Sequence, residues 1–131
     1  MRKDIEIPKV ENVHIVAVKE WDEDFTELHW NIYIVNNRDE DISTILVLSR
    51  GKSDDRKTST LRHGLGDLKP QTSAKVEFIS PEVLGFTNEY MVTFFLGNRM
   101  FEKKFVFDPN SISDENTTEI PVMENEGVLA K

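Results

Sequence analysis

Apolar and polar residues alternate through residues 89–107, and this period of two places alternate side chains on one face of a β-strand. Gly97-Asn98 separates two such runs, and glycine at the first central position suits a tight type II′ hairpin turn. The pattern therefore predicts an antiparallel hairpin with one apolar face, and such a face needs a second sheet to cover it. The residues on that face are Tyr90, Val92, Phe94, Leu96, Phe101, Phe105 and Phe107.

Further segments with strand-like patterns precede this hairpin, and short polar turns separate them. Segment 28–36 alternates most cleanly, because its apolar residues from Leu28 to Ile34 share one face with Trp30. Segment 42–49 is so apolar that we expect it at the centre of a sheet. The predicted strands of this part of the chain are 13–21, 28–36, 42–49, 58–63 and 73–79.

The two strands before the hairpin have different characters. Segment 58–63 has the β-branched content of a short, exposed edge strand. Residues 65–72 contain two Gly, an Asp and a Pro, which indicates a connecting corner. In segment 73–79 the alternation predicts that Val76 and Phe78 point inward.

Residues 80–85 carry the start and stop signals of one short helical turn. Ser80 suits the N-cap, Pro81 the first helical position and Gly85 the end, so we expect a helical turn near 81–84. Seven short strands without a βαβ pattern predict an all-β fold, an immunoglobulin-like antiparallel β-sandwich. Tyr90, near the start of the sixth strand, resembles the tyrosine corner of such folds. A small open barrel is the alternative architecture.

The composition changes after residue 107, which divides the chain into a β-sandwich domain at 1–107 and an acidic C-terminal linker and tail at 108–131. The tail holds six acids and one Lys, and Ser, Asn and Thr crowd 110–118. Two short apolar patches follow at 120–123 and 128–130. They either pack back on the sandwich as an extended strap or form a docking tail for a partner.

The composition of the whole chain limits its class. With 131 residues the chain is long enough for one domain with a substantial core. Since it has no cysteine, it has no disulfide or thiol chemistry, and this favours a reducing compartment. The N-terminal residues 1–12 lack the apolar stretch of a signal peptide, so we expect a cytoplasmic protein without membrane contact. The net charge of -8 repels phosphate backbones, which argues against a nucleic-acid partner.

Catalytic and metal-binding motifs are absent from the sequence. His14, His29 and His63 show no metal-binding spacing, so a zinc site would need two of them brought together with a carboxylate. The hypothesis that the protein is an enzyme would require His29 or His63 to lie in a cleft beside acidic residues. The acidic loops at 20–24 and 39–41 lie at opposite ends of the second strand, which excludes a shared calcium site. We therefore assign no catalytic, cofactor-binding or metal-binding residue, and expect no cofactor.

Residues 50–63 form the one basic stretch, with five bases against two acids. Lys and Arg neutralise phosphates, so this stretch is the candidate for an anion or nucleic-acid contact. It lacks the stacking aromatics of single-strand binding surfaces, and its charges are alternatively expected to neutralise the acidic 19–26 loop at the same end of the sandwich. The candidate residues are Arg50, Lys52, Arg56, Lys57 and Arg62.

A well-formed core without a catalytic constellation predicts a non-enzymatic protein-interaction module whose protein partner is unknown. Unpaired strand edges can pair with another chain, so an edge strand or the tail is expected to make the contact, with a partner or with a second copy of this chain. The candidate contact residues are one Trp beside the acidic turn and four apolar residues of the tail: Trp21, Val122, Met123, Val128 and Leu129.

Four stretches of the chain are distinctive together: KDIEIPKVENVHIVAVKEW at 3–21, RKTSTLRH at 56–63, GNRMFEKKFVF at 97–107 and IPVMENEGVLAK at 120–131. They resemble a family of short bacterial proteins of about this length, and the resemblance covers nearly the whole chain. Some members are named phenylalanyl-tRNA synthetase alpha chain, which implies an alternative function as an accessory domain that contacts tRNA or an aminoacyl-tRNA synthetase through 50–63. No catalytic residues come with the resemblance, and the class II elements F-R-x-E and G-x-E-R are missing, so we expect no autonomous aminoacylation.

Overall fold

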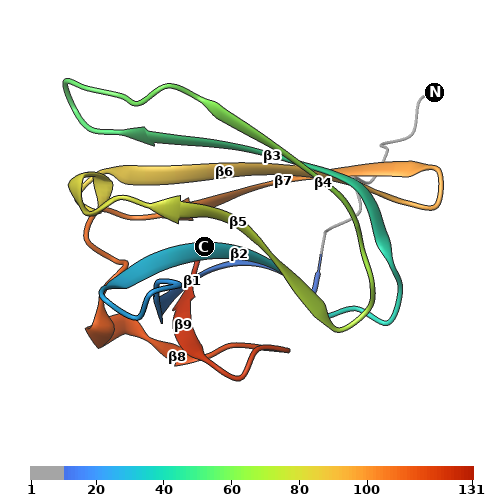
Figure 1. The fold of residues 1–131 in the computed structure, drawn as a ribbon. Coiled ribbons are helices and arrows are strands. Elements are labelled where there is room, and N and C mark those ends of the chain that lie inside the picture. The colour runs from blue at the N-terminus through green and yellow to red at the C-terminus, as the bar shows by residue number, and fades with distance from the viewer. Residues whose placement is uncertain (1–10) are drawn as a thin grey trace.

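The structure, a computed structural model, describes residues 11–131 as two antiparallel β-sheets packed face to face (Figure 1). The first ten residues of the predicted domain 1–107, and with them most of the segment inspected for a signal peptide, lie outside the described residues. None of the described helical segments is long and apolar enough to cross a membrane. The strands are β1 (Val13–Trp21), β2 (Leu28–Asn36), β3 (Ile42–Lys52), β4 (Leu61–Leu68), β5 (Thr72–Ile79), β6 (Thr87–Leu96), β7 (Arg99–Phe107), β8 (Thr118–Glu119) and β9 (Glu126–Leu129).

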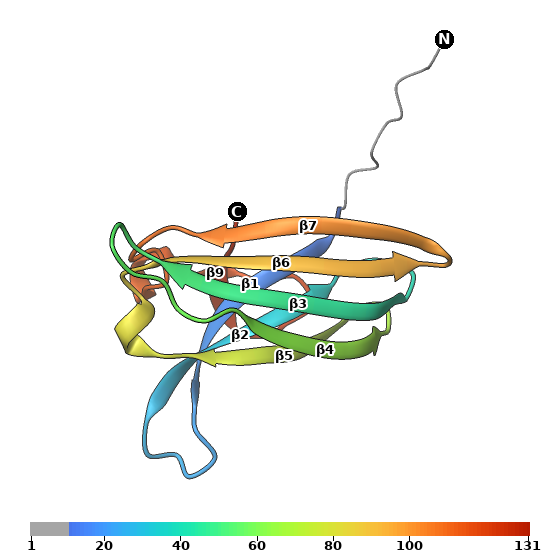
Figure 2. The same ribbon diagram turned by 90° about the horizontal axis from the view of Figure 1, so that it is seen from above.

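One sheet has the strand order β5-β2-β1-β9-β8 and the other the order β4-β3-β6-β7, so the predicted antiparallel sandwich is confirmed (Figures 1 and 2). The predicted hairpin is β6-β7, whose register ends with Leu96 opposite Arg99, and Gly97 has the positive φ of 62° that its turn requires. The predicted helical turn is the 3-10 helix η1 (Pro81–Val83), where the Ser80 hydroxyl accepts a hydrogen bond from the Glu82 amide at 3.3 Å.

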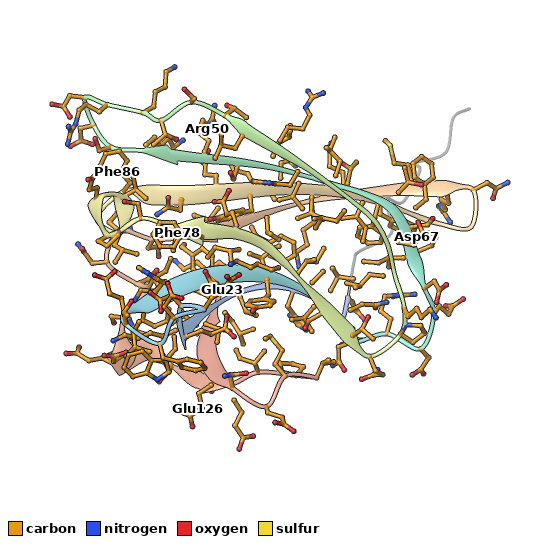
Figure 3. All side chains as sticks on the ribbon, viewed as in Figure 1. Glu23, Arg50, Asp67, Phe78, Phe86 and Glu126 are labelled. Atoms are coloured by element: carbon orange, nitrogen blue, oxygen red, sulfur yellow. The ribbon has the colours of Figure 1, made fainter. Side chains whose placement is uncertain are left out.

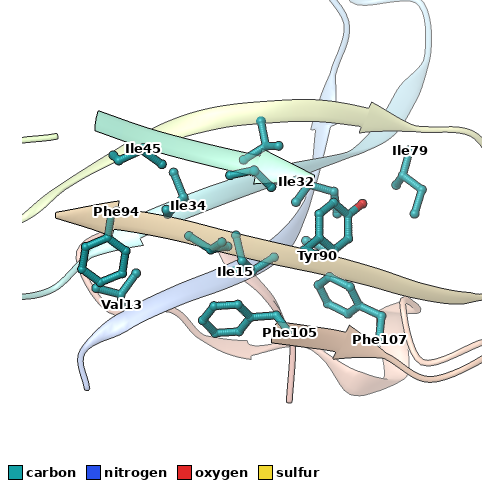
Figure 4. Close-up of a cluster of buried hydrophobic side chains, with 14 of the residues drawn as sticks. Val13, Ile15, Ile32, Ile34, Ile45, Ile79, Tyr90, Phe94, Phe105 and Phe107 are labelled. Carbon is teal, nitrogen blue, oxygen red and sulfur yellow. The ribbon is translucent and has the colours of Figure 1, made fainter. Parts of the chain in front are cut away.

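The core lies between the two sheets and follows the predicted parities of β2 and β6 (Figure 4). Tyr90, Phe94 and Phe107 are its largest fully buried side chains, and the rings of Tyr90 and Phe107 meet edge to face at 6.0 Å. Opposite them, Ile32 and Ile34 of β2 are completely buried. The interior is therefore built from the period-two positions of strands that lie far apart in the sequence.

β4 differs from its prediction, because the strand occupies Leu61–Leu68 and the corner predicted at 65–72 begins only after it. Two register shifts in its pairing with β3 explain the difference. They fall between Ile42 and Leu46 of β3, opposite the part of β4 that contains Gly66 at a φ of 70°. Glycine permits the bulged conformation that keeps this half of the strand paired.

The tail, residues 108–131, is the extended strap of the two interpretations above. It contains the 3-10 helix η2 (Asp114–Asn116), β8 and β9, and its Ile112, Ile120 and Val128 are buried. β9 pairs with β1, and Lys131 then exchanges two backbone hydrogen bonds of 2.9 and 3.2 Å with Val106 of β7. The last residues therefore join the edges of both sheets, and the tail is part of the folded sandwich.

The strap also explains the continuous apolar run in β1. Ile15 and Ala17 face the main core, whereas Val16 and Val18 belong to a second buried cluster on the other face of the sheet, under Ile120 of the strap. A strand buried on both faces has an unbroken apolar sequence rather than an alternating one. The fit is tight, because a Cβ atom added at Gly127 would lie 2.5 Å from the carbonyl oxygen of Ala17.

Candidate functional site: the open edge between β4 and β5

The opposite long edge of the sandwich is open. β4 and β5 are the outermost strands of their sheets, and no strand pairing joins them in the described part of the chain. They leave a shared turn at residues 69–71 and diverge from it, as Figure 1 shows. Each strand therefore presents an unpaired backbone edge on this side of the molecule, which we call the open edge.

A cavity of about 320 Å³ lies between the sheets where β4 and β5 have diverged, a volume at the lower end of the range for ligand sites, roughly 300–1,000 Å³. Leu61 of β4 and Phe78 of β5 are among its lining residues, and they are 53% and 47% exposed. Ser49 and Tyr90 supply polar atoms to the lining. Figure 3 labels two lining residues from opposite sheets, Arg50 and Phe78.

Glu77 of β5 is the centre of the polar contacts in this cavity. Its Oε1 accepts a hydrogen bond from Ser49 Oγ at 2.8 Å and lies 2.7 Å from His63 Nε2. Its Oε2 accepts a hydrogen bond from the Tyr90 hydroxyl at 2.8 Å. The three partners come from β3, β4 and β6, so this one carboxylate connects the first sheet to three strands of the second.

A β-bulge brings Glu77 to this position and corrects one prediction. The register of β5 against β2 skips Val76, so the inward parity passes from Val76 to Glu77 and Ile79. Val76 is buried as expected, but the prediction that Phe78 points inward is wrong, and the ring lies half-exposed at the open edge. A period-two pattern cannot reveal an inserted residue, which is why sequence reasoning missed both Glu77 and Phe78.

The Tyr90 hydroxyl is a permanent hydrogen-bond donor in this network. Burial, followed by the nearby Glu77 charge, raises the pKa of Tyr90 far above its ordinary value, so the hydroxyl stays a neutral donor. His63 stands beside a carboxylate at a cavity, which is the arrangement that the enzymatic hypothesis required. However, Ser49 and Tyr90 both donate a hydrogen bond to Glu77, and His63 contacts it as well, so three side chains hold the carboxylate in place.

The basic segment is divided between two environments. Arg50 and Lys52, with Lys104 of β7, surround Glu89 at 2.7, 3.1 and 2.9 Å. Hydrogen bonds from Arg50 and then from Lys104 lower the pKa of Glu89 to about 2. No ion pair joins residues 51–57 to the 19–26 loop within the described residues. Lys52 pairs instead with Glu89, which lies directly opposite Arg50 in the β3-β6 register.

Arg56, Lys57 and Arg62 form no ion pair within residues 11–131, and we call these three residues the basic rim. The guanidinium of Arg56 lies 5.5 Å from the ring centroid of Phe86, a cation–π contact. Lys57 forms an isolated backbone bridge with Lys52, and Arg62 is on β4 next to Leu61. Within residues 11–131, the basic rim thus carries positive charge that no ion pair neutralises, in the β3-β4 loop and at the start of β4.

The candidate protein-contact residues do not form one surface. Trp21 is 54% exposed at the end of β1, and Val122 and Leu129 of the strap are partly exposed. Met123 packs against the second buried cluster, and Val128 is buried in the main core. Of the four contact residues predicted in the strap, only Val122 and Leu129 therefore expose apolar surface.

Comparisons with protein families, with curated proteins and with solved structures returned no match, so the site is interpreted from its own geometry.

Proposed function

We propose that this protein is a non-enzymatic protein-interaction module that binds an extended segment of a partner at the open edge. The observation that carries the proposal is a cavity between the sheets, flanked by two unpaired strand edges and by the exposed side chains of Leu61 and Phe78. An extended peptide that adds a strand to a sheet edge gains backbone hydrogen bonds, and adjacent pockets take its alternate side chains.

Of the two edges, β4 suits strand addition better than β5. β4 pairs with β3 in an uninterrupted register from Leu61 to Gly64, so its outer edge is regular there. β5 carries the bulge at Val76 and the exposed Lys75, and both features protect a strand edge from pairing. The partner segment is therefore assigned to the side of β4 that faces the cavity.

The charges at this edge define the chemistry of the segment. The chain has a net charge of -8, yet Lys57 and Arg62 of the basic rim are sequence neighbours of Thr58 and Leu61, which line the cavity. The three rim residues form no ion pair among the described residues. Complementary charges steer association and fix register. The segment is thus an extended acidic peptide with an apolar side chain that fills the cavity next to Leu61.

Two finer statements belong to the same proposal. β2 pairs with β5 and β3 with β6, crossed connections of the kind found in Greek-key sandwiches, and this order supports an immunoglobulin-like module. The absence of cysteine supports a cytoplasmic location.

A linear dodecamer library, selected against the full chain and followed by fluorescence polarisation of the recovered peptides, tests the proposal. We expect acidic peptides with alternating apolar residues, and we expect Leu61→Ser to weaken their binding about tenfold or more, because one buried Leu side chain is worth about 1.5–3 kcal/mol. Met100→Ser is the matched control, since Met100 is 59% exposed at the distant end of the β6-β7 hairpin.

Three outcomes would contradict the binding of an acidic partner peptide at β4. Equal binding of the recovered peptides by the Leu61 and Met100 variants would place the contact elsewhere. A dimer at working concentration that Leu61→Ser dissociates would make a second copy of this chain the occupant. A tRNA gel shift that weakens steeply with salt and is lost on substitution of the basic rim would instead support the nucleic-acid alternative.

A further inference from the structure

The loop of the β1-β2 hairpin gathers side chains that could bind a metal ion, and it adjoins the open edge through the contact of His29 with Phe78. The hairpin loop extends past β5, on the side of the molecule where β4 and β5 lie (Figure 2). Asp22 directly follows β1, Glu27 directly precedes β2, and His29 is the second residue of β2. One ligand atom from each of these three residues lies within 4.8 Å of the other two.

Local contacts hold two of the three side chains in position. The Asp22 carboxylate accepts a hydrogen bond from the Thr26 amide at 2.8 Å and another from the Thr26 hydroxyl at 2.7 Å. The His29 ring stands edge-on to Phe78, with centroids 5.0 Å apart and an angle of 90° between the planes. Contacts of this type orient the ligands of metal sites, so Asp22 and His29 are arranged before any ion binds.

The distances fit a small divalent ion. His29 Nε2 is 3.5 Å from Glu27 Oε2 and 4.0 Å from Asp22 Oδ2. A tetrahedral Zn²⁺ site has bonds of about 2.0–2.1 Å and therefore requires ligand atoms about 3.3 Å apart. The Glu27 oxygen is already close to that spacing from His29, whereas Asp22 must approach His29 from 4.0 Å to about 3.3 Å when an ion binds.

The charge of the hairpin also favours a cation. Residues 20–29 contain five acids and no Lys or Arg. Within residues 11–131, no Lys or Arg forms an ion pair with Asp22 or Glu27, whose only ion-pair partner is His29. An imidazole ligand selects Zn²⁺ and related transition ions over Ca²⁺ and Mg²⁺, which prefer oxygen ligands alone.

We propose that Asp22, Glu27 and His29 form a binding site for a divalent transition ion of the Zn²⁺ class, with three protein ligands and an open fourth position. The sequence analysis did not predict this site, because it required two histidines and a carboxylate for a zinc site, and this cluster contains one histidine. Two carboxylates and one imidazole come together here only because the hairpin closes.

Zn²⁺ alone, titrated into the full-length chain by calorimetry and followed by the imidazole signals in NMR, tests the site. We expect one ion per chain and a shift of the His29 ring resonances, with no such shift on addition of Mg²⁺. Glu27→Gln should weaken Zn²⁺ binding at least about tenfold, since even outer partners of metal ligands are worth that much.

Glu23→Gln is the matched control, because it removes an equal charge from the same loop outside the cluster. This variant should change the affinity less than threefold. An equal loss of affinity in both variants would reduce the effect to diffuse attraction by the acidic loop and overturn the site. If the His29 ring resonances do not shift at saturating Zn²⁺, the cluster is only an ion pair of His29 with the two carboxylates. That result would also overturn the proposed metal site.

Discussion

The two long edges of this sandwich are built in opposite ways. On the closed edge, β9 pairs with β1, and Lys131 exchanges backbone hydrogen bonds with Val106 of β7. The C-terminal residues therefore connect the two sheets along this edge. On the open edge, β4 and β5 diverge and leave a cavity with Leu61 and Phe78 exposed beside it. The same fold thus uses one edge to complete its core and leaves the other accessible, so the closed edge contributes to stability and the open edge is where we propose that a partner binds.

Alanine substitution of one glycine in a strand at each edge tests this division and has the largest expected effect. Gly127→Ala should destabilise the protein by roughly 1–3 kcal/mol, because the new Cβ would meet the Ala17 carbonyl oxygen at 2.5 Å. Gly64→Ala on β4 has no atom within 4 Å of the new Cβ and should change stability by less than about 0.5 kcal/mol. Urea unfolding of both variants measures the difference, and equal midpoints would contradict the comparison.

Glu89 separates the basic residues that form ion pairs within the fold, Arg50 and Lys52, from the basic rim, which forms none among the described residues. Its pKa of about 2 lies below the ordinary 4.5, so its ionic contribution is fully present above about pH 4.5 and is lost as the pH falls towards 2. Glu89→Gln should therefore cost about 1 kcal/mol at pH 7, a small value because the surrounding cations are nearly half-exposed and screened by solvent.

This cost should disappear near pH 2, as measured by urea unfolding across the pH range. Glu102→Gln on β7 is the control, since Glu102 is exposed and forms no ion pair among the described residues. A difference between wild type and Glu89→Gln that persists unchanged at pH 2 would show that the effect does not come from the ionised carboxylate.

The smallest expected effect concerns the stability of the open edge itself. Phe78→Ser and Leu61→Ser should each change the free energy of unfolding by less than about 1 kcal/mol, because both side chains are about half-exposed. Thermal unfolding beside the Met100→Ser control measures this. A loss of several kcal/mol would mean that the open edge is part of the core and not a surface kept for a partner.

The features that could be predicted from the sequence were those that depend on neighbouring residues. The β6-β7 hairpin, the inward face with Tyr90 and Phe94, and the helical turn after Ser80 all follow from local patterns. The strap was one of two interpretations of the tail, and the buried Val128 belongs to that interpretation.

The features that could not be predicted depend on register between distant strands. The bulge at Val76 turned Glu77 inward and Phe78 outward, and no alternation pattern contains that information. The Glu89 cluster exists because β3 and β6 align Arg50 with it. The 22–29 hairpin has an Asp at one end and a His at the other, and this was the sequence signal that could have indicated the cluster of Asp22, Glu27 and His29.

The pairing of β9 with β1 has a consequence for how the protein is made. Leu129 meets Val16, so one central strand finds its neighbour only after more than 100 further residues have been synthesised. At translation rates of about 5–20 residues per second, β1 waits on the order of ten seconds with one side uncovered. Chaperones that shield nascent strands would act during this interval, and a ribosome that stalls before residue 126 would release a sheet able to aggregate.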